Sequence, residues 1–290
     1  MSLRTAVLLK SLLPKCSCSQ HLRSHWTLWF PHKKGYDYIE PDIPLWTRMK
    51  MAMKIWPREI KRYKDEKVSE DQFVHELIGP YHNELKIEYE FNKPETINKF
   101  VVSTDADWHR GFSTGEFVLS ENSTGLFRGN IDTRVPQDGT TYRSGFVNLS
   151  SPEKTKPFFV PDYHKDWMQF THLAIKVRGD GRRYSIILGA PGTFDVMWHD
   201  IYAYYLHTHG GPYWQYELVP MSKFFLTSHG RVQDKQLSLD TMKPNRVSFT
   251  VGDNIPGQFC LEIAWIGVYL DVSHFEEFAY EQYKTPYATA

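Results

Sequence analysis

The sequence predicts an all-β protein, a β-sandwich or jelly roll, on three observations. From Leu85 onward, apolar residues alternate with charged ones, as in Ile87, Tyr89 and Phe91, and this period of two is typical of half-buried strands. Roughly ten more short segments of this kind follow, separated by turns that carry Gly, Asn or Asp and with no helical pattern between them. The chain is also rich in aromatic residues, with 9 Trp, 17 Tyr and 18 Phe, which suit strands and protein interfaces.

The expected strands after the first share short length, apolar or alternating character and flanking turn residues. They are Phe100–Ser103, Glu116–Ser120, Leu126–Ile131, Ser144–Asn148, Leu173–Val177, Tyr184–Leu188, Ile201–His207, Trp214–Val219, Val247–Val251 and Phe259–Tyr269. The turn Gly179-Asp180-Gly181 separates two of them and predicts a β-hairpin.

Helices are expected only outside the strand-rich region. Proline disrupts a helix interior, so Pro57 predicts that one helix ends near Trp56 and that another begins there. A capping box at Ser69 and Gln72 predicts a short helix that ends at the Gly-Pro pair of residues 79–80.

A second capping box, Ser273 with Glu276, predicts a C-terminal helix over Ser273–Tyr283. The expected organisation therefore has four parts. These are a transit peptide over 1–36, a helical N-terminal extension over 37–84, a β-sandwich domain over 85–272, and a C-terminal helix and tail over 273–290.

The first 36 residues carry six basic residues and no acidic one. A segment rich in Arg, Lys, Ser and Leu and lacking acids is typical of a mitochondrial transit peptide. A secretory signal is the alternative, but Lys10 interrupts the apolar core Ala6–Leu9 well short of the ~7–15 residues such signals need. Import into mitochondria is therefore favoured, and the cleavage point is not specified by the sequence.

The rest of the chain has 28 basic and 34 acidic residues, a net charge of −6, which argues against a nucleic-acid partner. The longest apolar run, Phe259–Leu270, falls short of the ~18–20 residues that cross a bilayer, so we expect a soluble or peripheral protein. Cys16 and Cys18 belong to the presequence, and Cys260 alone offers neither a disulfide framework nor a cysteine zinc site.

Two polar clusters are candidate metal sites, and neither has a full ligand set. Asp105 and Asp107 could bind calcium, but an Asp-rich loop with a closing Glu is missing, so a solvated turn is favoured. His207 and His209 lie two apart on a strand, with His199 close by, and no further ligand is visible. We expect no metal and no cofactor.

No nucleophile elbow, P-loop, dinucleotide fingerprint or His-Glu-x-x-His motif is present, so no catalytic residue is predicted and the chain is expected not to be an enzyme. A Ser/His/Asp triad assembled from distant residues, as in a hydrolase, remains an alternative because triads are defined in space.

One apolar stripe is a candidate binding surface. Trp46, Met49, Met53 and Trp56 follow one another at spacings of three, four and three, which places them on one face of a helix. That face either packs on the sandwich or binds a partner, since exposed Met and Trp suit adaptable apolar interfaces.

Several longer motifs resemble the complex I intermediate-associated protein family. They are VRGDGRRYSIIL from Val177, WQYELVPMSKFFLTSHGRV from Trp214, VSFTVGD from Val247 and GQFCLEIAWIGV from Gly257. VSTDADWHRGFSTGEF, LFRGNI and SGFVNL match the opening strands of the family, so the resemblance covers roughly residues 85–270 in order.

The resemblance implies a galactose-binding-like jelly roll and a role as an assembly factor, or chaperone, for mitochondrial respiratory complex I. It implies a location in the matrix, peripheral to the inner membrane. It also implies action with an acyl-CoA-dehydrogenase-like flavoprotein and an adaptor protein on membrane-arm intermediates and subunits. A carbohydrate-binding module on the same fold is a further alternative, with Trp108, Tyr213 and Trp214 as candidate platforms.

Overall fold

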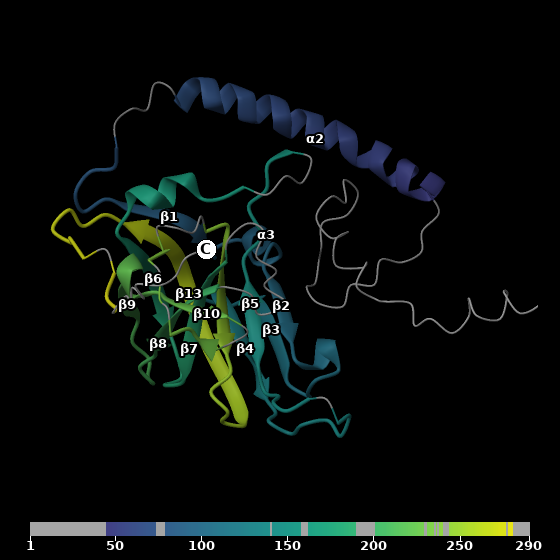
Figure 1. Ribbon diagram of the computed structural model, residues 1–290, viewed down its shortest axis with the longest axis vertical. Helices are drawn as coiled ribbons and strands as arrows, with labels where there is room; N and C mark the ends of the chain where they lie inside the picture. The colour runs from purple at the N-terminus through teal and green to yellow at the C-terminus, as the bar shows by residue number, and fades with distance from the viewer. Residues whose placement is uncertain are drawn as a thin grey trace, which may run out of the picture.

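Two antiparallel sheets face each other in a β-sandwich, and one long helix lies across one end of it (Figure 1). The computed structural model describes residues 45–73, 79–139, 141–157, 162–189, 201–228, 231–234, 236, 238–239, 244–276 and 278–280. The expected all-β jelly roll and its N-terminal helical extension are confirmed, whereas the expected transit peptide, residues 1–36, lies outside the described residues.

The elements follow one another along the chain with short connections. The helices are α2 (Leu45–Phe73), α3 (Pro94–Ile97), and the 3-10 turns η2 (Ala106–Trp108), η4 (Lys165–Gln169) and η6 (Met221–Lys223). The strands are β1 (Leu85–Glu90), β2 (Val101–Thr104), β3 (Thr114–Leu119), β4 (Gly125–Ile131), β5 (Val147–Ser150), β6 (His172–Arg178), β7 (Arg183–Gly189), β8 (Ile201–His207), β9 (Gln215–Pro220), β10 (Phe225–Ser228), β11 (Arg231–Val232), β12 (Arg246–Val251) and β13 (Gly257–Tyr269).

The first sheet, called sheet A here, has the order β3-β4-β13-β6-β9, with β1 also paired to β13. The second, sheet B, has the order β11-β10-β8-β7-β12-β5-β2. Most neighbours in both sheets are distant in sequence, so the chain crosses repeatedly between the two layers. The predicted segments match strands except that β5 begins three residues later than expected, and β10 and β11 were not predicted.

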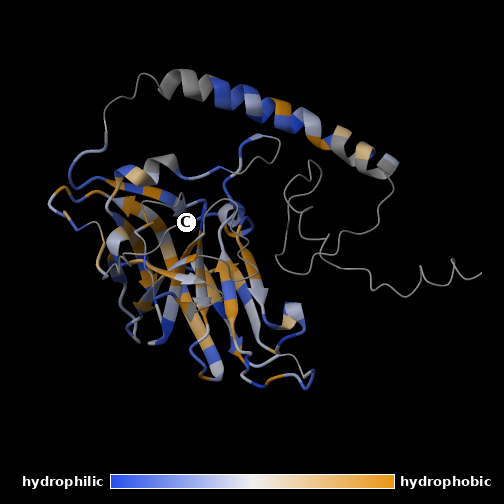
Figure 2. Ribbon diagram, in the orientation of Figure 1, coloured by the Kyte–Doolittle hydropathy of each residue, from blue (hydrophilic) through white to orange (hydrophobic). Residues whose placement is uncertain are grey.

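Strand β13 is the central strand of sheet A, and its side chains show how the core is filled. Phe259, Leu261 and Ile263 alternate inward, and then the register shifts by a bulge between Ile263 and Trp265. The bulge shifts the alternation by one residue, so that Ile266 and Val268 point into the core after it and are fully buried. Hydrophobic residues of both sheets meet in one core between the layers. Figure 2 shows that the strands of the sandwich are rich in hydrophobic residues.

Helix α2 is one continuous helix of 29 residues, so the expected break at Pro57 and the expected helix start at Ser69 are both wrong. Pro57 removes only one backbone donor, and the Met, Lys, Arg and Glu residues around it favour the helix on both sides. Ser69 lies inside this helix because the preceding turns already carry the helical conformation. None of the described helices is long and apolar enough to cross a membrane.

The turn at Gly179-Asp180-Gly181 is not a hairpin, contrary to the sequence prediction. Strand β6 before it belongs to sheet A and β7 after it belongs to sheet B, so the turn connects the two layers. The Asp180 carboxylate fixes this crossing because it accepts hydrogen bonds from the backbone N–H of Cys260 in β13 and from the Tyr184 hydroxyl. Gly181 has a positive φ of 91°, which an L side chain rarely adopts.

The expected C-terminal helix is wrong over its described residues, 273–276 and 278–280, which form turns and bends. Ser273, the expected capping residue, is bound by Asp271 instead. The Asp271 carboxylate accepts the Ser273 backbone N–H at 2.8 Å and the Ser273 hydroxyl at 2.6 Å. Glu276 accepts the Ser222 hydroxyl instead of completing a capping box. The boundary at residue 272 and the other domain limits stay predictions.

Candidate functional site

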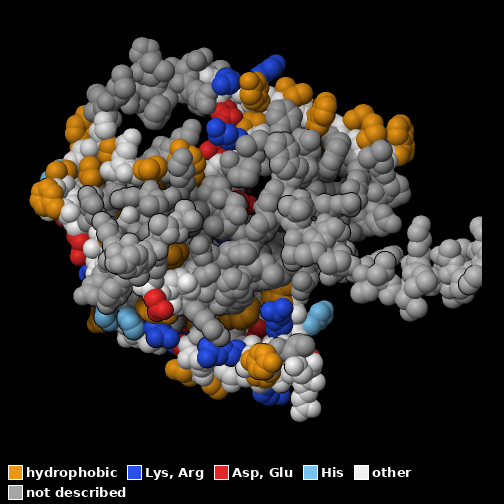
Figure 3. All heavy atoms as spheres, in the orientation of Figure 1, with side chains coloured by type: hydrophobic (Ala, Val, Ile, Leu, Met, Phe, Trp, Pro, Cys, Tyr) orange, Lys and Arg blue, Asp and Glu red, His pale blue; other side chains and the backbone are white. Residues whose placement is uncertain are grey.

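The four predicted stripe residues share one exposed face of α2. Trp46, Met49, Met53 and Trp56 are 63%, 42%, 59% and 50% exposed, and Figure 3 shows a row of hydrophobic side chains along the outer edge of the molecule. Since the helix continues past Pro57, the stripe continues as well.

Ile60 and Tyr63, which sequence reasoning missed, extend the row and are 43% and 48% exposed. Ile60 follows Trp56 by four residues and Tyr63 follows Ile60 by three, so both continue the helical spacing. They were missed because the helix was expected to end at Trp56. Together, these exposed apolar residues of α2 form the α2 stripe: Trp46, Met49, Met53, Trp56, Ile60 and Tyr63.

A different face of α2 is attached to the sandwich. Glu59 is 1% exposed, and its carboxylate accepts a hydrogen bond from Arg62 Nη1 at 3.0 Å and lies 3.4 Å from Arg58 Nε. Arg62 Nη2 in turn donates to the carbonyl of Thr155 at 2.8 Å, in the loop after β5. The Arg62–Thr155 hydrogen bond turns the Arg62 side of the helix toward the body, and the α2 stripe stays uncovered by the described residues.

The α2 stripe lies in a strongly basic segment. Residues 45–64 contain seven Lys or Arg and one acidic residue, Glu59, so their net charge is +6. Lys50, Lys54, Lys61 and Lys64 are exposed, and Lys50 Nζ lies 5.6 Å from the centre of the Trp46 ring. The surface is therefore apolar with a cationic border, although the chain after residue 36 is acidic overall.

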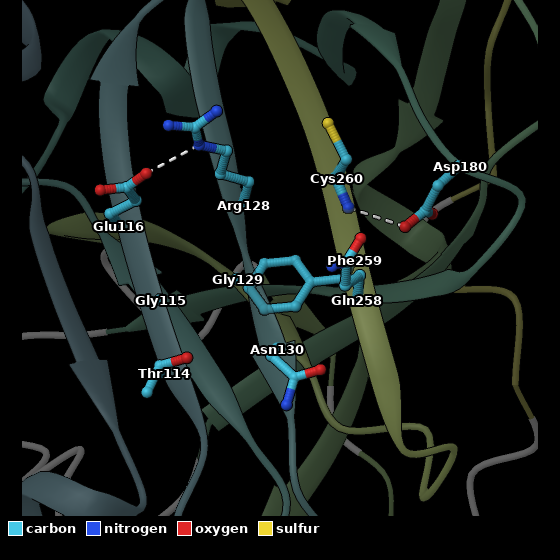
Figure 4. Close-up of a pocket in the computed structure, with 10 residues that line it drawn as sticks. All are labelled: Thr114, Gly115, Glu116, Arg128, Gly129, Asn130, Asp180, Gln258, Phe259 and Cys260. Carbon is cyan, nitrogen blue, oxygen red and sulfur yellow. Dashed lines mark hydrogen bonds and ion pairs between the residues drawn. The ribbon is translucent and has the colours of Figure 1, made fainter.

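A shallow hollow of about 770 Å³ lies on the outer face of sheet A, over β3, β4 and β13 (Figure 4). Most of its lining residues are polar, and some are engaged with each other: Glu116 pairs with Arg128 at 2.7 Å, and the Asp180 carboxylate accepts the Cys260 N–H at 2.8 Å. The only aromatic ring of its lining, Phe259, is 2% exposed and belongs to the core. The hollow therefore lacks an aromatic platform for a sugar.

The candidate sugar platforms are not brought together. Trp108 lies in η2 after a strand of sheet B, whereas Tyr213 and Trp214 precede β9 at the edge of sheet A. Tyr213 is 84% exposed, but the Trp214 ring is covered by Lys176 Nζ at 5.2 Å and Arg178 Cζ at 5.1 Å. These cation–π contacts occupy the ring that a sugar would stack on.

Arg178, one of the two cations that lie against the Trp214 ring, is held by a buried carboxylate. Arg178 donates to Glu262, which is 4% exposed and also accepts the Thr124 hydroxyl. A second hollow of about 400 Å³ opens beside this pair. Both carboxylate oxygens of Glu262 are engaged within the protein, so the pair acts as a structural link across β13, β6 and the turn before β4.

A serine and a histidine do meet, but not as a catalytic triad. Ser222 Oγ lies 3.3 Å from His274 Nε2, yet the hydroxyl donates to Glu276 Oε2 at 3.0 Å and is 4% exposed. In a triad the serine would donate to the histidine, whose other nitrogen would contact a carboxylate. Here the three residues attach the C-terminal segment to the β9–β10 connection, as does the Ala279 N–H that donates to the Ser222 carbonyl.

Asp105 has a structural role that the sequence did not reveal, since a solvated turn was expected. Its carboxylate is fully buried and accepts hydrogen bonds from the N–H groups of Ser113 at 2.9 Å and Gly145 at 2.6 Å. Gly111 packs so closely that a Cβ there would lie 2.0 Å from Asp105 Oδ2. The side chain joins three loops instead of presenting oxygens to calcium.

No group of three or more His, Cys, Asp or Glu residues that could hold a metal occurs in the described part of the chain. His207 and His209 are both exposed at the end of β8, and His199 lies outside the described residues. Burial, with Asp180 and Glu262 nearby, raises the pKa of the Cys260 thiol. A raised pKa makes this cysteine a poor nucleophile at neutral pH.

Together these features define a β-sandwich of two antiparallel sheets, with a basic helix that carries an exposed apolar stripe at one end. A family model described as complex I intermediate-associated protein 30 matches residues 89–263. By this match and by the relatives below, the chain belongs to that family.

Three curated relatives carry the family name with the word mitochondrial. The Drosophila melanogaster protein is 38% identical over 98% of this chain and 97% of its own length. The probable Caenorhabditis briggsae protein is 39% identical over 89% of this chain and 78% of its own, and the Mus musculus protein is 34% identical over 73% and 66%.

Solved structures with a similar trace include carbohydrate-binding modules and an agarase. A family 11 module of Clostridium thermocellum is 11% identical over 67% of this chain and all of its own, with a TM-score of 0.44. A CBM29-2 mutant complexed with mannohexaose is also 11% identical, over 66% and 94%, with a TM-score of 0.32. Little of their sequence is shared with this chain.

Proposed function

We propose that the protein is an assembly factor for mitochondrial respiratory complex I that acts by binding, without catalysis. Membership of the complex I intermediate-associated protein 30 family supports the target. The single observation that carries the mode of action is the α2 stripe, six large apolar side chains that stay exposed on a helix whose Arg62 side contacts the sandwich. Exposed apolar surface of this kind is typical of protein-interaction sites.

In this proposal the sandwich is the rigid body and α2 is the docking element. Trp46, Met49, Met53 and Trp56 bind membrane-arm intermediates and reduce the aggregation of their apolar surfaces before assembly is complete. The protein works in the matrix, peripheral to the inner membrane, together with an acyl-CoA-dehydrogenase-like flavoprotein and an adaptor protein. No cofactor takes part.

The test compares the full chain with a deletion of residues 45–80 in cells that lack the endogenous protein. The full chain is expected to restore mature complex I on native gels, and the deletion to restore less while retaining the thermal transition of the sandwich. Crosslinking mass spectrometry on mitochondria would then identify what touches α2. Failure of the full chain to restore complex I would refute the proposed function, whereas equal rescue by the deletion would refute the role of α2.

A further inference from the structure

The spacing of the α2 stripe specifies the shape of what covers it. The intervals from Trp46 to Tyr63 are three, four, three, four and three residues, which is the a and d pattern of a heptad repeat. Among the α2 side chains that the structure describes, the large exposed apolar ones all occupy a or d positions, which gives a seam with a 3.5-residue period. Such a seam fits the side of another helix, whereas a helix that lies on a lipid surface presents a wider apolar stripe.

The residues beside the seam specify the charge of that helix. In this heptad Lys50 and Lys64 occupy e positions and are exposed, whereas Glu59 and Glu66 occupy g positions. Glu59 is buried against Arg62, which binds the Thr155 carbonyl, and Glu66 is half-buried. The acidic border of the seam therefore faces the sandwich, and the open border is cationic.

We propose that the α2 stripe binds an acidic amphipathic helix of a partner protein, packed side by side with α2 as in a coiled coil. Resting on the proposed function, this inference names the chemistry of the partner: apolar a and d residues with Glu or Asp opposite Lys50 and Lys64. A second copy of this chain fits poorly, since two identical segments, each with a net charge of +6 over residues 45–64, would repel each other.

The binding test uses the full chain and a labelled synthetic helix of about 28 residues, with Leu at every a and d position and Glu at every e and g position. Fluorescence anisotropy should show saturable binding that weakens as salt rises from about 50 mM to about 500 mM. A matched peptide with Lys in place of every Glu should bind at least about tenfold more weakly, because it presents like charge to the open border.

Three double variants separate the seam from the charge around it. Met53→Ala with Trp56→Ala removes the two central side chains of the seam and should weaken peptide binding by about tenfold or more, while alanine preserves the helix. Lys50→Ala with Lys64→Ala removes the open border and should weaken binding several-fold at low salt. Lys54→Ala with Lys61→Ala removes equal charge at the more distant b positions and should change binding by less than about twofold.

Three results would overturn this inference. One is the absence of stripe-dependent binding to the acidic peptide. The others are stripe-dependent binding to phosphatidylcholine vesicles with about one-fifth cardiolipin in preference to the peptide, and stripe-dependent dimers in sedimentation velocity.

The cell assay keeps this inference distinct from the proposed function. Full rescue of complex I by the Met53→Ala, Trp56→Ala chain would refute the helix seam and leave the assembly role standing. A wild-type chain that fails to rescue would refute the assembly role itself.

Discussion

The β-sandwich and helix α2 use large apolar residues in opposite ways. In the sandwich, Phe127, Leu261 and Ile266 are fully buried between the two sheets, so their removal from water stabilises the fold. In α2, Trp46 and Met53 are 63% and 59% exposed, and Arg62, which also pairs with Glu59, contacts the body through the Thr155 carbonyl.

The difference teaches that hydrophobicity alone does not identify the core of this protein. The buried apolar residues are explained by packing in the core, whereas the exposed α2 stripe is proposed to bind a partner. Substitutions in the two regions should therefore separate stability from binding.

The largest expected effect is in the core. Phe127→Ala removes a fully buried ring that packs against Phe259 with 5.0 Å between ring centres. Such a cavity should lower the free energy of unfolding by about 3–5 kcal/mol, measured by urea titration with circular dichroism. Tyr142→Ala, at an 89% exposed residue, is the control and should stay within about 0.5 kcal/mol. A core loss below about 1 kcal/mol would contradict the packing described here.

The buried carboxylate should have the next largest effect. Asp105→Ala leaves the N–H groups of Ser113 and Gly145 without their acceptor, and unsatisfied buried donors cost about 2–3 kcal/mol in total. Asp107→Ala, at an exposed residue that accepts one N–H from Thr104, should cost less than about 1 kcal/mol in the same unfolding experiment. Equal losses for the two variants would show that the burial of Asp105 is not what matters.

A pH effect should separate His172 from exposed histidines. Burial, with His274 nearby, lowers the pKa of His172, so the folded state favours the neutral ring more than the unfolded chain does. The stabilisation is complete above the unfolded pKa of about 6.5 and is lost as pH falls toward the lower folded pKa. Urea unfolding between pH 7.5 and pH 5 should show a decline that His172→Asn reduces and that His207→Asn, at an exposed residue, leaves unchanged. An identical decline in all three proteins would rule out His172 as its source.

The smallest expected effect on stability is in the α2 stripe. Trp56→Ala should change the free energy of unfolding by less than about 0.5 kcal/mol, because the ring is half exposed and alanine favours the helix. The same variant should weaken binding to the acidic helix peptide, so stability and binding would diverge. A stability loss above about 1.5 kcal/mol would mean that the stripe packs on the body and would remove the contrast with the core.

The candidate site was predictable where its signal was local. Trp46, Met49, Met53 and Trp56 were found from spacing alone, since helical geometry fixes which residues share a face. Ile60 and Tyr63 were missed because Pro57 predicts a helix end. In the folded chain the helix continues through Pro57, since the loss of its backbone hydrogen bond is outweighed by favourable helical turns on both sides. Exposure of the stripe could not be predicted, because it depends on the link from Arg62 to Thr155, 93 residues away in sequence.

By itself, the sequence determined the all-β class, most strand positions and the helical stripe, because each follows from the period of neighbouring side chains. Only the tertiary structure decided that Gly179–Gly181 crosses between sheets, that Asp105 is buried and that Ser273 caps no helix. Each of these depends on a hydrogen-bond partner or a strand pairing, and local patterns do not specify partners. Which face of α2 stays open is decided in the same way, by contacts that only the folded chain brings together.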